Sequence, residues 1–204
     1  MQGSIETKYN GYRFRSRLEA RWAVFFDVMG IYYIYEPEGF ERKIGIDPGL
    51  ETIRYLPDFY LPDYRLYAEV KAARMRSEIK DDDEYRMSWL IDFNGPLADG
   101  LIMLGYIPDA IGAETMCYAV QRWSGKSLEW GYIEFSDYPD MSRFEGYDHH
   151  TAPCTFDAND DLILTGSVIC APTMTGTLVE KALMAARSAR FEHGEKPIFL
   201  GGQK

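Results

Sequence analysis

The spacing of apolar side chains near the N-terminus predicts an amphipathic helix over residues 13–29. Apolar residues recur there at steps of three and four positions, which places them on one face of a helix. They are Phe14, Leu18, Trp22, Phe25, Phe26 and Met29. Gly30 follows at a position where glycine commonly ends a helix. The aromatic members of this stripe are expected to lie in the core.

Segments rich in β-branched and aromatic residues predict four strands after this helix. The predicted strands cover residues 31–35, 53–60, 65–72 and 101–107. The last is a nearly continuous apolar run, as expected of a buried central strand. Residues 61–64, Leu-Pro-Asp-Tyr, predict a hairpin connection between the second and third strands.

A second helix is predicted over residues 77–93, where an acidic run lies near the start and suits the helix dipole. Later in the chain, residues 116–135 alternate around a Ser-Gly-Lys-Ser turn and predict another hairpin. Residues 136–161 are dense in Asp, Pro, Gly and His and are expected to form a loop. A strand over residues 162–170 and a helix over residues 177–193 complete the prediction.

The order of these elements favours an α/β unit with an appended part. Residues 1–107 follow the order helix, strand, strand, strand, helix, strand. Residues 108–204 then form a C-terminal α+β extension that is expected to pack on the first unit.

Asp58, Glu69 and Lys71 are charged side chains that the predicted strands bring together. Side chains alternate along a strand, so Glu69 and Lys71 project from one face and Val70 from the other. Antiparallel pairing of the preceding strand would place Asp58 beside them. Two neighbouring carboxylates repel each other, and a hard divalent cation offsets that cost by accepting oxygen ligands from both. The cluster therefore predicts a divalent metal site.

Magnesium suits this cluster better than zinc, because no compact set of Cys and His side chains joins it. A plainer interpretation is an exposed strand salt bridge next to a turn aspartate. A second Pro-Asp pair, Pro62-Asp63, is a rival for the metal-binding aspartate. Only five residues separate Asp63 from Glu69, however, so Asp63 is expected to make the turn.

Four short motifs resemble, in order and spacing, those of the PD-(D/E)XK nucleases, the restriction-endonuclease-like superfamily. The motifs are Phe14-Arg15-Ser16-Arg17-Leu18-Glu19-Ala20, Tyr35-Glu36-Pro37, Pro57-Asp58 and Glu69-Val70-Lys71. They span residues 12–107, about half of the chain, and the chain is most similar to small phage and transposon nucleases of the TnsA type. The resemblance implies a core of αβββαβ order, with a mixed central sheet flanked by helices.

The same resemblance implies a role for each matching residue. Asp58 and Glu69 would bind Mg²⁺, for which Mn²⁺ can substitute, with the backbone carbonyl of Val70 as a further ligand. Lys71 would orient or activate the attacking water. Glu19 on the first helix would assist the metal, directly or through a water, as the fourth member of the catalytic set. Glu36 precedes a proline and is expected to be structural.

DNA binding is expected from Arg13, Arg17 and Arg21, which lie on the polar face of the predicted first helix and would hold phosphates. The net charge of −10 opposes such binding at first sight, because Lys and Arg supply most of the affinity for phosphates. The charge is uneven, however. Residues 1–80 contain 13 Lys and Arg against 12 Asp and Glu, so the remaining 124 residues carry −11.

The compartment is predicted from what the sequence does not contain. No apolar run approaches the roughly 20 residues that a membrane-spanning helix needs, and the first ten residues are too polar for a signal peptide. Three widely spaced cysteines do not resemble a disulfide framework. We therefore expect a cytoplasmic protein, in a bacterial host cell or encoded by a phage, with no membrane contact.

The leading hypothesis is a metal-dependent DNA endonuclease of phage or mobile-element origin, acting in DNA processing or recombination. Many members of the superfamily that the chain resembles act as dimers, since cutting both strands of a duplex needs two sites, and the resemblance implies a homodimer here. One alternative is a protein-binding module on a nuclease fold, in which the acidic extension makes the contact. Another is a nuclease that works only in a complex, where a partner protein supplies the DNA targeting.

Overall fold

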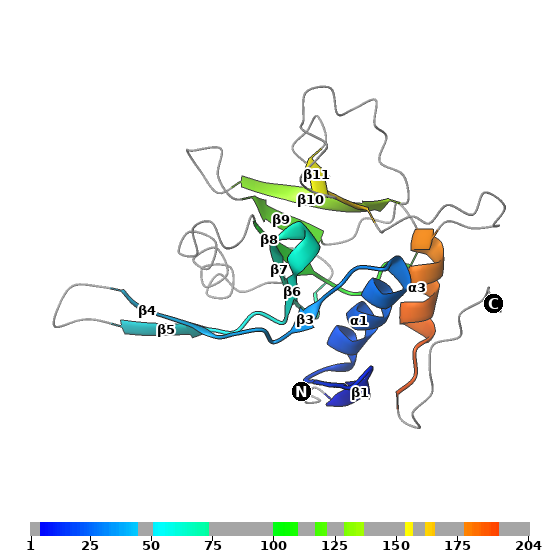
Figure 1. Cartoon of the computed structure of the whole chain (residues 1–204), viewed down its shortest axis with the longest axis horizontal. Coiled ribbons are helices and arrows are strands. Elements are labelled where there is room, and N and C mark those ends of the chain that lie inside the picture. The colour runs from blue at the N-terminus through cyan, green and yellow to red at the C-terminus, as the bar shows by residue number, and fades with distance from the viewer. Residues whose placement is uncertain are drawn as a thin grey trace.

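An eight-stranded β-sheet and two neighbouring helices form the body of the protein in the computed structural model (Figure 1). The structure describes residues 5–44, 51–73, 100–109, 117–121, 129–136, 154–156, 162–165 and 178–191. The sheet contains both parallel and antiparallel pairs. The prediction of an α/β protein with a mixed sheet is therefore confirmed.

The N-terminal part of the chain contains eight described strands, one helix and one 3₁₀ turn. The strands are β1 (Thr7–Tyr9), β2 (Tyr12–Phe14), β3 (Ile34–Tyr35), β4 (Phe40–Ile44), β5 (Glu51–Tyr55), β6 (Phe59–Leu61), β7 (Leu66–Val70) and β8 (Gly100–Leu104). The helix is α1 (Arg17–Met29), and the turn is η1 (Pro62–Tyr64). The described elements that follow are β9 (Cys117–Gln121), β10 (Glu129–Ser136), β11 (Cys154–Phe156), β12 (Leu162–Thr165) and α3 (Leu178–Ser188).

The large sheet has the strand order β11-β12-β10-β9-β8-β7-β6-β3. β7 pairs with β8 in parallel, and β6 pairs antiparallel with both β7 and β3. A parallel pair needs a crossover connection of roughly a dozen residues or more, and residues 71–99 are long enough to provide it. The helix predicted over residues 77–93 falls in this connection, outside the described residues.

The first helix begins later than predicted, because Arg13 belongs to β2 rather than to α1. β2 pairs antiparallel with β1 around Asn10 and Gly11, which have positive φ angles of 46° and 84°. An Asn-Gly pair with positive φ angles favours a tight hairpin turn. The turn chemistry at Asn10-Gly11 therefore overrides the helical periodicity that included Arg13 and Phe14.

The ends of α1 follow from its capping residues. Ser16 is the N-cap, and its Oγ accepts the backbone N–H of Glu19 at 3.1 Å. The helix ends at Met29 as predicted, and Gly30 adopts the left-handed conformation, with φ 71°, that commonly closes a helix.

The strand predicted over residues 53–60 is divided into two. β5 pairs with β4 in a two-stranded ribbon that extends away from the body in Figure 1, whereas β6 belongs to the large sheet. Pro57 lies at the break, where its missing N–H removes a donor that a continuous strand would use. β3 is also shorter than predicted, covering only Ile34–Tyr35 of residues 31–35. The hairpin between β6 and β7 and the buried strand β8 are confirmed.

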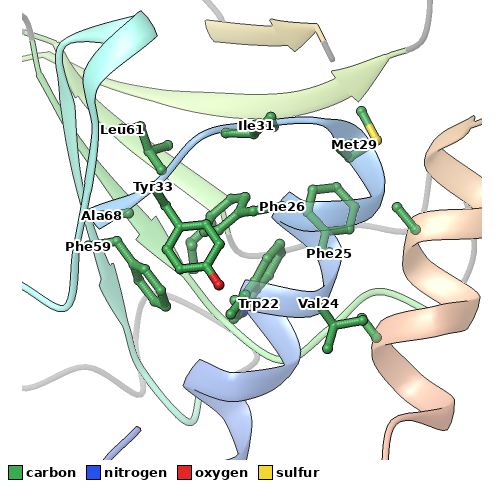
Figure 2. Packing of buried hydrophobic residues seen from close by; sticks show 14 of the residues in the cluster. Trp22, Val24, Phe25, Phe26, Met29, Ile31, Tyr33, Phe59, Leu61 and Ala68 are labelled. Atoms are coloured by element: carbon green, nitrogen blue, oxygen red, sulfur yellow. The ribbon is translucent and has the colours of Figure 1, made fainter. Parts of the chain in front are cut away.

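Aromatic side chains of α1 pack between the helix and the sheet (Figure 2). Trp22, Phe25 and Phe26 are fully buried, and Phe26 meets Phe59 of β6 edge-on with ring centroids 5.5 Å apart. The indole N–H of Trp22 donates to the backbone oxygen of Gly105 at 2.8 Å, which ties α1 to the end of β8. Buried alanines of α3 join the same core from the other side of α1. The predicted burial of the α1 stripe is confirmed.

The sheet continues beyond residue 107, because β9 pairs antiparallel with β8. β9 also pairs with β10, which confirms the hairpin predicted over residues 116–135. The expectation that residues 136–161 are all loop is wrong at β11, which pairs with β12. β11 has only three residues, which are too few for a strand pattern to be recognised in the sequence, and its backbone partners come from β12. None of the helices in the described ranges combines the length and the apolar character needed to cross a membrane.

Candidate functional site

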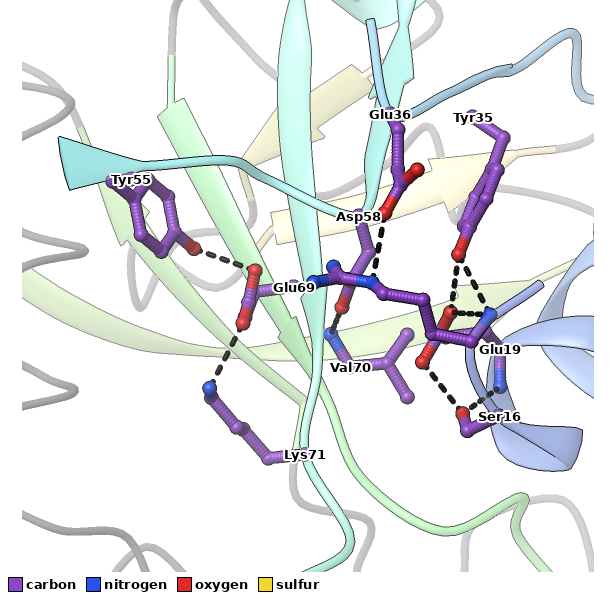
Figure 3. A network of polar contacts seen from close by, with 10 residues as sticks. Ser16, Glu19, Tyr35, Glu36, Tyr55, Asp58, Glu69, Val70 and Lys71 are labelled. Carbon is purple, nitrogen blue, oxygen red and sulfur yellow. Dashed lines mark hydrogen bonds and ion pairs between the residues drawn. The ribbon is translucent and has the colours of Figure 1, made fainter. Parts of the chain in front are cut away.

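Asp58 lies directly before β6, at the point where the chain leaves β5. Its side chain is buried, with the residue only 3% exposed, and its Oδ2 accepts the backbone N–H of Val70 on β7 at 2.7 Å (Figure 3). The backbone oxygen of Asp58 accepts the N–H of Glu36 at 2.8 Å, just after β3. Contacts to the strands on both sides of β6 therefore fix the position of Asp58.

The strand register brings Asp58 to Glu69. Phe59 of β6 is paired with Ala68 of β7, so continuing the antiparallel register by one residue sets Asp58 opposite Glu69. Directly opposed residues of an antiparallel pair lie close together. The predicted neighbourhood of these two carboxylates therefore follows from the pairing of β6 with β7.

Glu69 is held by two polar side chains. Its Oε1 forms an ion pair with Nζ of Lys71 at 2.8 Å, and its Oε2 accepts the hydroxyl of Tyr55 at 2.6 Å (Figure 3). Glu69 is only 6% exposed, and about a quarter of the Lys71 side chain is accessible. The plain alternative of an exposed strand salt bridge is right about the Lys71–Glu69 ion pair but wrong about its exposure, because both Asp58 and Glu69 are buried. Asp63 is exposed in η1 and makes the turn, as expected.

Arg15 provides a cationic contact to Asp58 that the sequence motifs did not assign. Its Nη2 donates to Oδ1 of Asp58 at 2.5 Å, and its Nε forms an ion pair with Oε1 of Glu36 at 2.8 Å. Glu36 was expected to be structural, and this ion pair shows that it also contacts the site through Arg15. Asp58 is thus bonded through Oδ1 to a guanidinium and through Oδ2 to the backbone of β7.

Glu19 is buried at the start of α1, where three donors hold its carboxylate. Oε1 accepts the hydroxyl of Ser16 at 2.6 Å. Oε2 accepts the hydroxyl of Tyr35 at 2.7 Å and the backbone N–H of Arg15 at 3.0 Å. These contacts make Glu19 part of the helix cap. Its negative charge still reaches Asp58, where it contributes to a raised pKa.

The electrostatics of the site centre on Asp58. Burial is the largest cause that raises the pKa of Asp58 from its ordinary value of 3.8 to about 8, and the negative charge of Glu69 is the second. The N–H of Val70 and the guanidinium of Arg15 act in the opposite direction and favour the carboxylate. Burial and the neighbouring carboxylates therefore outweigh the favourable contacts that Asp58 makes with Arg15 and Val70.

The raised pKa of Asp58 is expected to make the stability of the protein depend on pH. Because the pKa of Asp58 is higher in the folded than in the unfolded chain, its contribution is complete below pH 3.8 and is lost as the pH rises through about 8. Asp58→Asn removes this loss. In EDTA, we expect the free energy of unfolding of the variant to gain roughly 1 to 3 kcal/mol on the wild type between pH 4.5 and pH 8.5. Urea denaturation of both proteins at these pH values measures the difference, and parallel pH profiles would contradict the assignment.

The three arginines predicted to hold DNA do not share one helix face. Arg13 lies on β2, where its guanidinium pairs with Glu6. Arg17 begins α1, and Arg21 follows one turn later; both are partly buried. Nε of Arg21 is buried and has no hydrogen-bond partner among the described residues. The expected row of arginines is therefore corrected to a pair on α1 and a separate residue on β2.

The donor set of the site fits a hard divalent cation. Asp58 and Glu69 supply carboxylate oxygens, and Mg²⁺ commonly binds one or two carboxylates while keeping several waters. Across the described ranges, no group of three or more His, Cys, Asp or Glu side chains is arranged to hold a metal ion. Glu19 in particular is engaged by Ser16 and Tyr35, so any help it gives to a cation would come through a water or through its charge.

Several residues of the site were missed by sequence reasoning. Ser16 and Glu19 have the spacing of a capping box, which could have located the helix start and the anchor of Glu19. Tyr35 and Tyr55 show no comparable local signal, because each bonds a residue at least 14 positions away. Arg15 was visible within the first motif, but its partner Asp58 lies 43 positions away.

Comparison with known proteins does not assign the chain to a family. No protein-family model and no curated protein matches it. One solved structure, "Crystal structure of SSO0001", is similar over 50% of this chain, at 14% identity and a TM-score of 0.35. The match covers 46% of that chain, and so low a TM-score carries no argument about fold or function.

Proposed function

We propose that the protein is a metal-dependent DNA endonuclease that hydrolyses phosphodiester bonds. The observation that carries the proposal is the burial of Asp58, directly before β6, opposite the buried Glu69 of the neighbouring strand β7. Burying two carboxylates side by side costs free energy, and carboxyl groups with strongly perturbed pKa values are more frequent at functional sites than elsewhere. A divalent cation would compensate both charges, and Lys71 adds a cationic side chain next to them.

The order of the elements supports a restriction-endonuclease-like core. α1 is followed by β3, β6 and β7, and β8 then joins β7 in parallel. This agrees with the αβββαβ order that the PD-(D/E)XK resemblance implies, with the second helix expected in the crossover between β7 and β8. The β4–β5 ribbon is inserted between the first and second strands of this series.

Each side chain would have a distinct part in the reaction. A bound Mg²⁺ or Mn²⁺ would lower the pKa of a coordinated water and stabilise the negative charge that develops on phosphorus. Tyr55 and Lys71 hold Glu69 from its two oxygens, which fixes the direction of its carboxylate. The ammonium group of Lys71 would orient the attacking water. Glu19 would keep negative charge near Asp58 and so favour cation binding.

Cleavage assays with purified protein test the proposal. Supercoiled plasmid, linear duplex, single strands and a four-way junction are incubated with Mg²⁺, Mn²⁺ or EDTA. We expect cleavage that requires the metal, and Lys71→Ala should lower its rate by at least about a hundredfold. Lys43→Ala is the matched control, because Lys43 is exposed on the β4–β5 ribbon away from the site. Cleavage that is unaffected by Lys71→Ala would refute the site, and failure on every substrate would argue against an autonomous nuclease.

A nuclease that depends on a partner protein for DNA affinity is the second candidate. The charge of −11 beyond residue 80 and the pairing of Arg13 with Glu6 both reduce the positive surface available to DNA. In that case the isolated chain would bind Mg²⁺ but would not cleave, and a partner would supply phosphate contacts. A homodimer or a nuclease complex is compatible with this candidate. The protein-binding module without cleavage would bind neither Mg²⁺ nor DNA.

A further inference from the structure

Arg15 combines a fixed backbone with an accessible side chain. Its backbone N–H donates to Glu19 at 3.0 Å and to the hydroxyl of Tyr35 at 2.9 Å, which anchors it between β2 and α1. About half of its side chain is nevertheless exposed, although its Nη2 reaches the buried Asp58. The guanidinium therefore enters the site from the solvent side.

We propose that Arg15 is a phosphate-binding residue, which occupies Asp58 in the metal-free protein and is released toward the substrate when a divalent cation binds. This inference rests on the proposed nuclease function. It assigns Arg15 two alternating partners, the Asp58 carboxylate and a DNA phosphate, and it assigns Glu36 the task of keeping Arg15 beside the site in both states.

The exchange follows from the oxygens of Asp58. Oδ2 is bonded to the N–H of Val70, and Oδ1 is bonded to Arg15. A divalent cation that takes Oδ1 as a ligand would meet a positive guanidinium at the same oxygen. The two positive charges would repel each other, so we expect Arg15 to move away from Asp58 when the cation binds. Its accessible side chain allows this movement without a change in the core.

Glu36 keeps the released guanidinium close. Its carboxylate holds Nε of Arg15 at 2.8 Å, while its own backbone N–H donates to the backbone oxygen of Asp58. Glu36 has a φ of 45°, a left-handed conformation that costs energy for a residue with a side chain. The hydrogen bond to Asp58 maintains this conformation, and with it the position of the Glu36 carboxylate. Glu36 is therefore a positioning residue for Arg15.

A phosphate is the ligand that suits the released group. Arg has five N–H donors in a planar fork that matches phosphate oxygens, and the Nη2 donor that now bonds to Asp58 becomes available once Asp58 binds the cation. The released nitrogen would then be able to donate to a phosphodiester bound next to the cation. Arg15 would thus bring its positive charge to the substrate phosphate only after the metal has bound.

Magnesium titration measures the competition between Mg²⁺ and Arg15 for the Asp58 carboxylate. Isothermal calorimetry without DNA is carried out on the wild type, Arg15→Gln, Arg15→Lys and the control Arg54→Gln. Arg54 is exposed on β5 and pairs with Glu41, outside the site. We expect Arg15→Gln to bind Mg²⁺ roughly three to ten times more tightly, because the competing charge is removed. Arg15→Lys and Arg54→Gln should stay close to the wild type.

Single-turnover cleavage at saturating Mg²⁺ measures what Arg15 contributes to the reaction once the metal is bound. Arg15→Gln is expected to be slower by about a hundredfold, because one charged contact to the reacting phosphate is lost. Arg15→Lys should recover part of the rate and also serves as the folded variant if Arg15→Gln is unstable. Tighter metal binding with slower cleavage supports the exchange. Loss of both together, or no change in either, overturns it.

The failure of this inference differs from the failure of the proposed function. If the wild type neither binds Mg²⁺ nor cleaves DNA, the nuclease proposal fails and Arg15 loses its assigned role with it. If the wild type does both and Arg15→Gln matches it, only the role of Arg15 is refuted.

Discussion

Asp58→Asn is expected to lower the rate of metal-dependent DNA cleavage by at least about a hundredfold. Asparagine has nearly the same shape and can still accept the N–H of Val70 through its oxygen. It lacks the charge that draws a divalent cation to Oδ1, however, and its NH₂ group cannot act as a ligand. The rate is measured on plasmid at saturating Mg²⁺, with the fold checked by circular dichroism.

The second Pro-Asp pair provides the control for this substitution. Asp63 follows Pro62 in η1, and it is exposed in the turn between β6 and β7. Asp63→Asn changes the same functional group in a similar local sequence without touching the site. We expect its cleavage rate to match that of the wild type. An equal loss in both variants, or no loss in either, would contradict the role of Asp58.

Trp22→Ala is expected to cause the largest loss of stability, about 3 to 5 kcal/mol in the free energy of unfolding. Trp22 is fully buried, and its ring packs against Phe25 and Phe26 with centroids 5.2 and 6.1 Å away. The substitution leaves a cavity and also removes the donor to the backbone oxygen of Gly105. Urea denaturation measures the loss.

A solvent-exposed aromatic residue provides the comparison for Trp22. Tyr32 is 59% exposed, so Tyr32→Ala should change the free energy of unfolding by less than about 0.5 kcal/mol. Equal effects of the two substitutions would show that Trp22 does not lie at the centre of the core. A large loss at Trp22 alone would support the attachment of α1 to the end of β8.

The parts of the fold that sequence could predict are those with a strong local pattern. The helical stripe from Leu18 to Met29 and the apolar run of β8 each identify a buried face without knowledge of their neighbours. The start of α1 was placed too early, because the Asn10-Gly11 turn and the Ser16 cap both outweigh periodicity. The break at Pro57 was missed because the residues around it favour a strand. Pro57 itself has no backbone N–H to donate to a neighbouring strand.

The sequence predicted the charged residues at the centre of the candidate site, but not the side chains that hold them in place. Glu69 and Lys71 are two residues apart at the end of β7, so the strand period alone places them on the same face, where they form an ion pair. Arg15 and Tyr55 reach the same carboxylates from distant parts of the chain, and only the tertiary structure brings them there. Three-dimensional contacts also explain why Arg13, which looked like part of a helical row, is paired with Glu6 on a separate hairpin.

We expect Asp58 and Glu69 together to hold one divalent cation. Crystals of the protein soaked in Mn²⁺ and measured at the manganese absorption edge test this directly, because the anomalous signal locates the ion. We predict a single peak between the two carboxyl groups, with the guanidinium of Arg15 moved away from Asp58. A peak elsewhere, or no peak with Asp58 still bonded to Arg15, would contradict the claim.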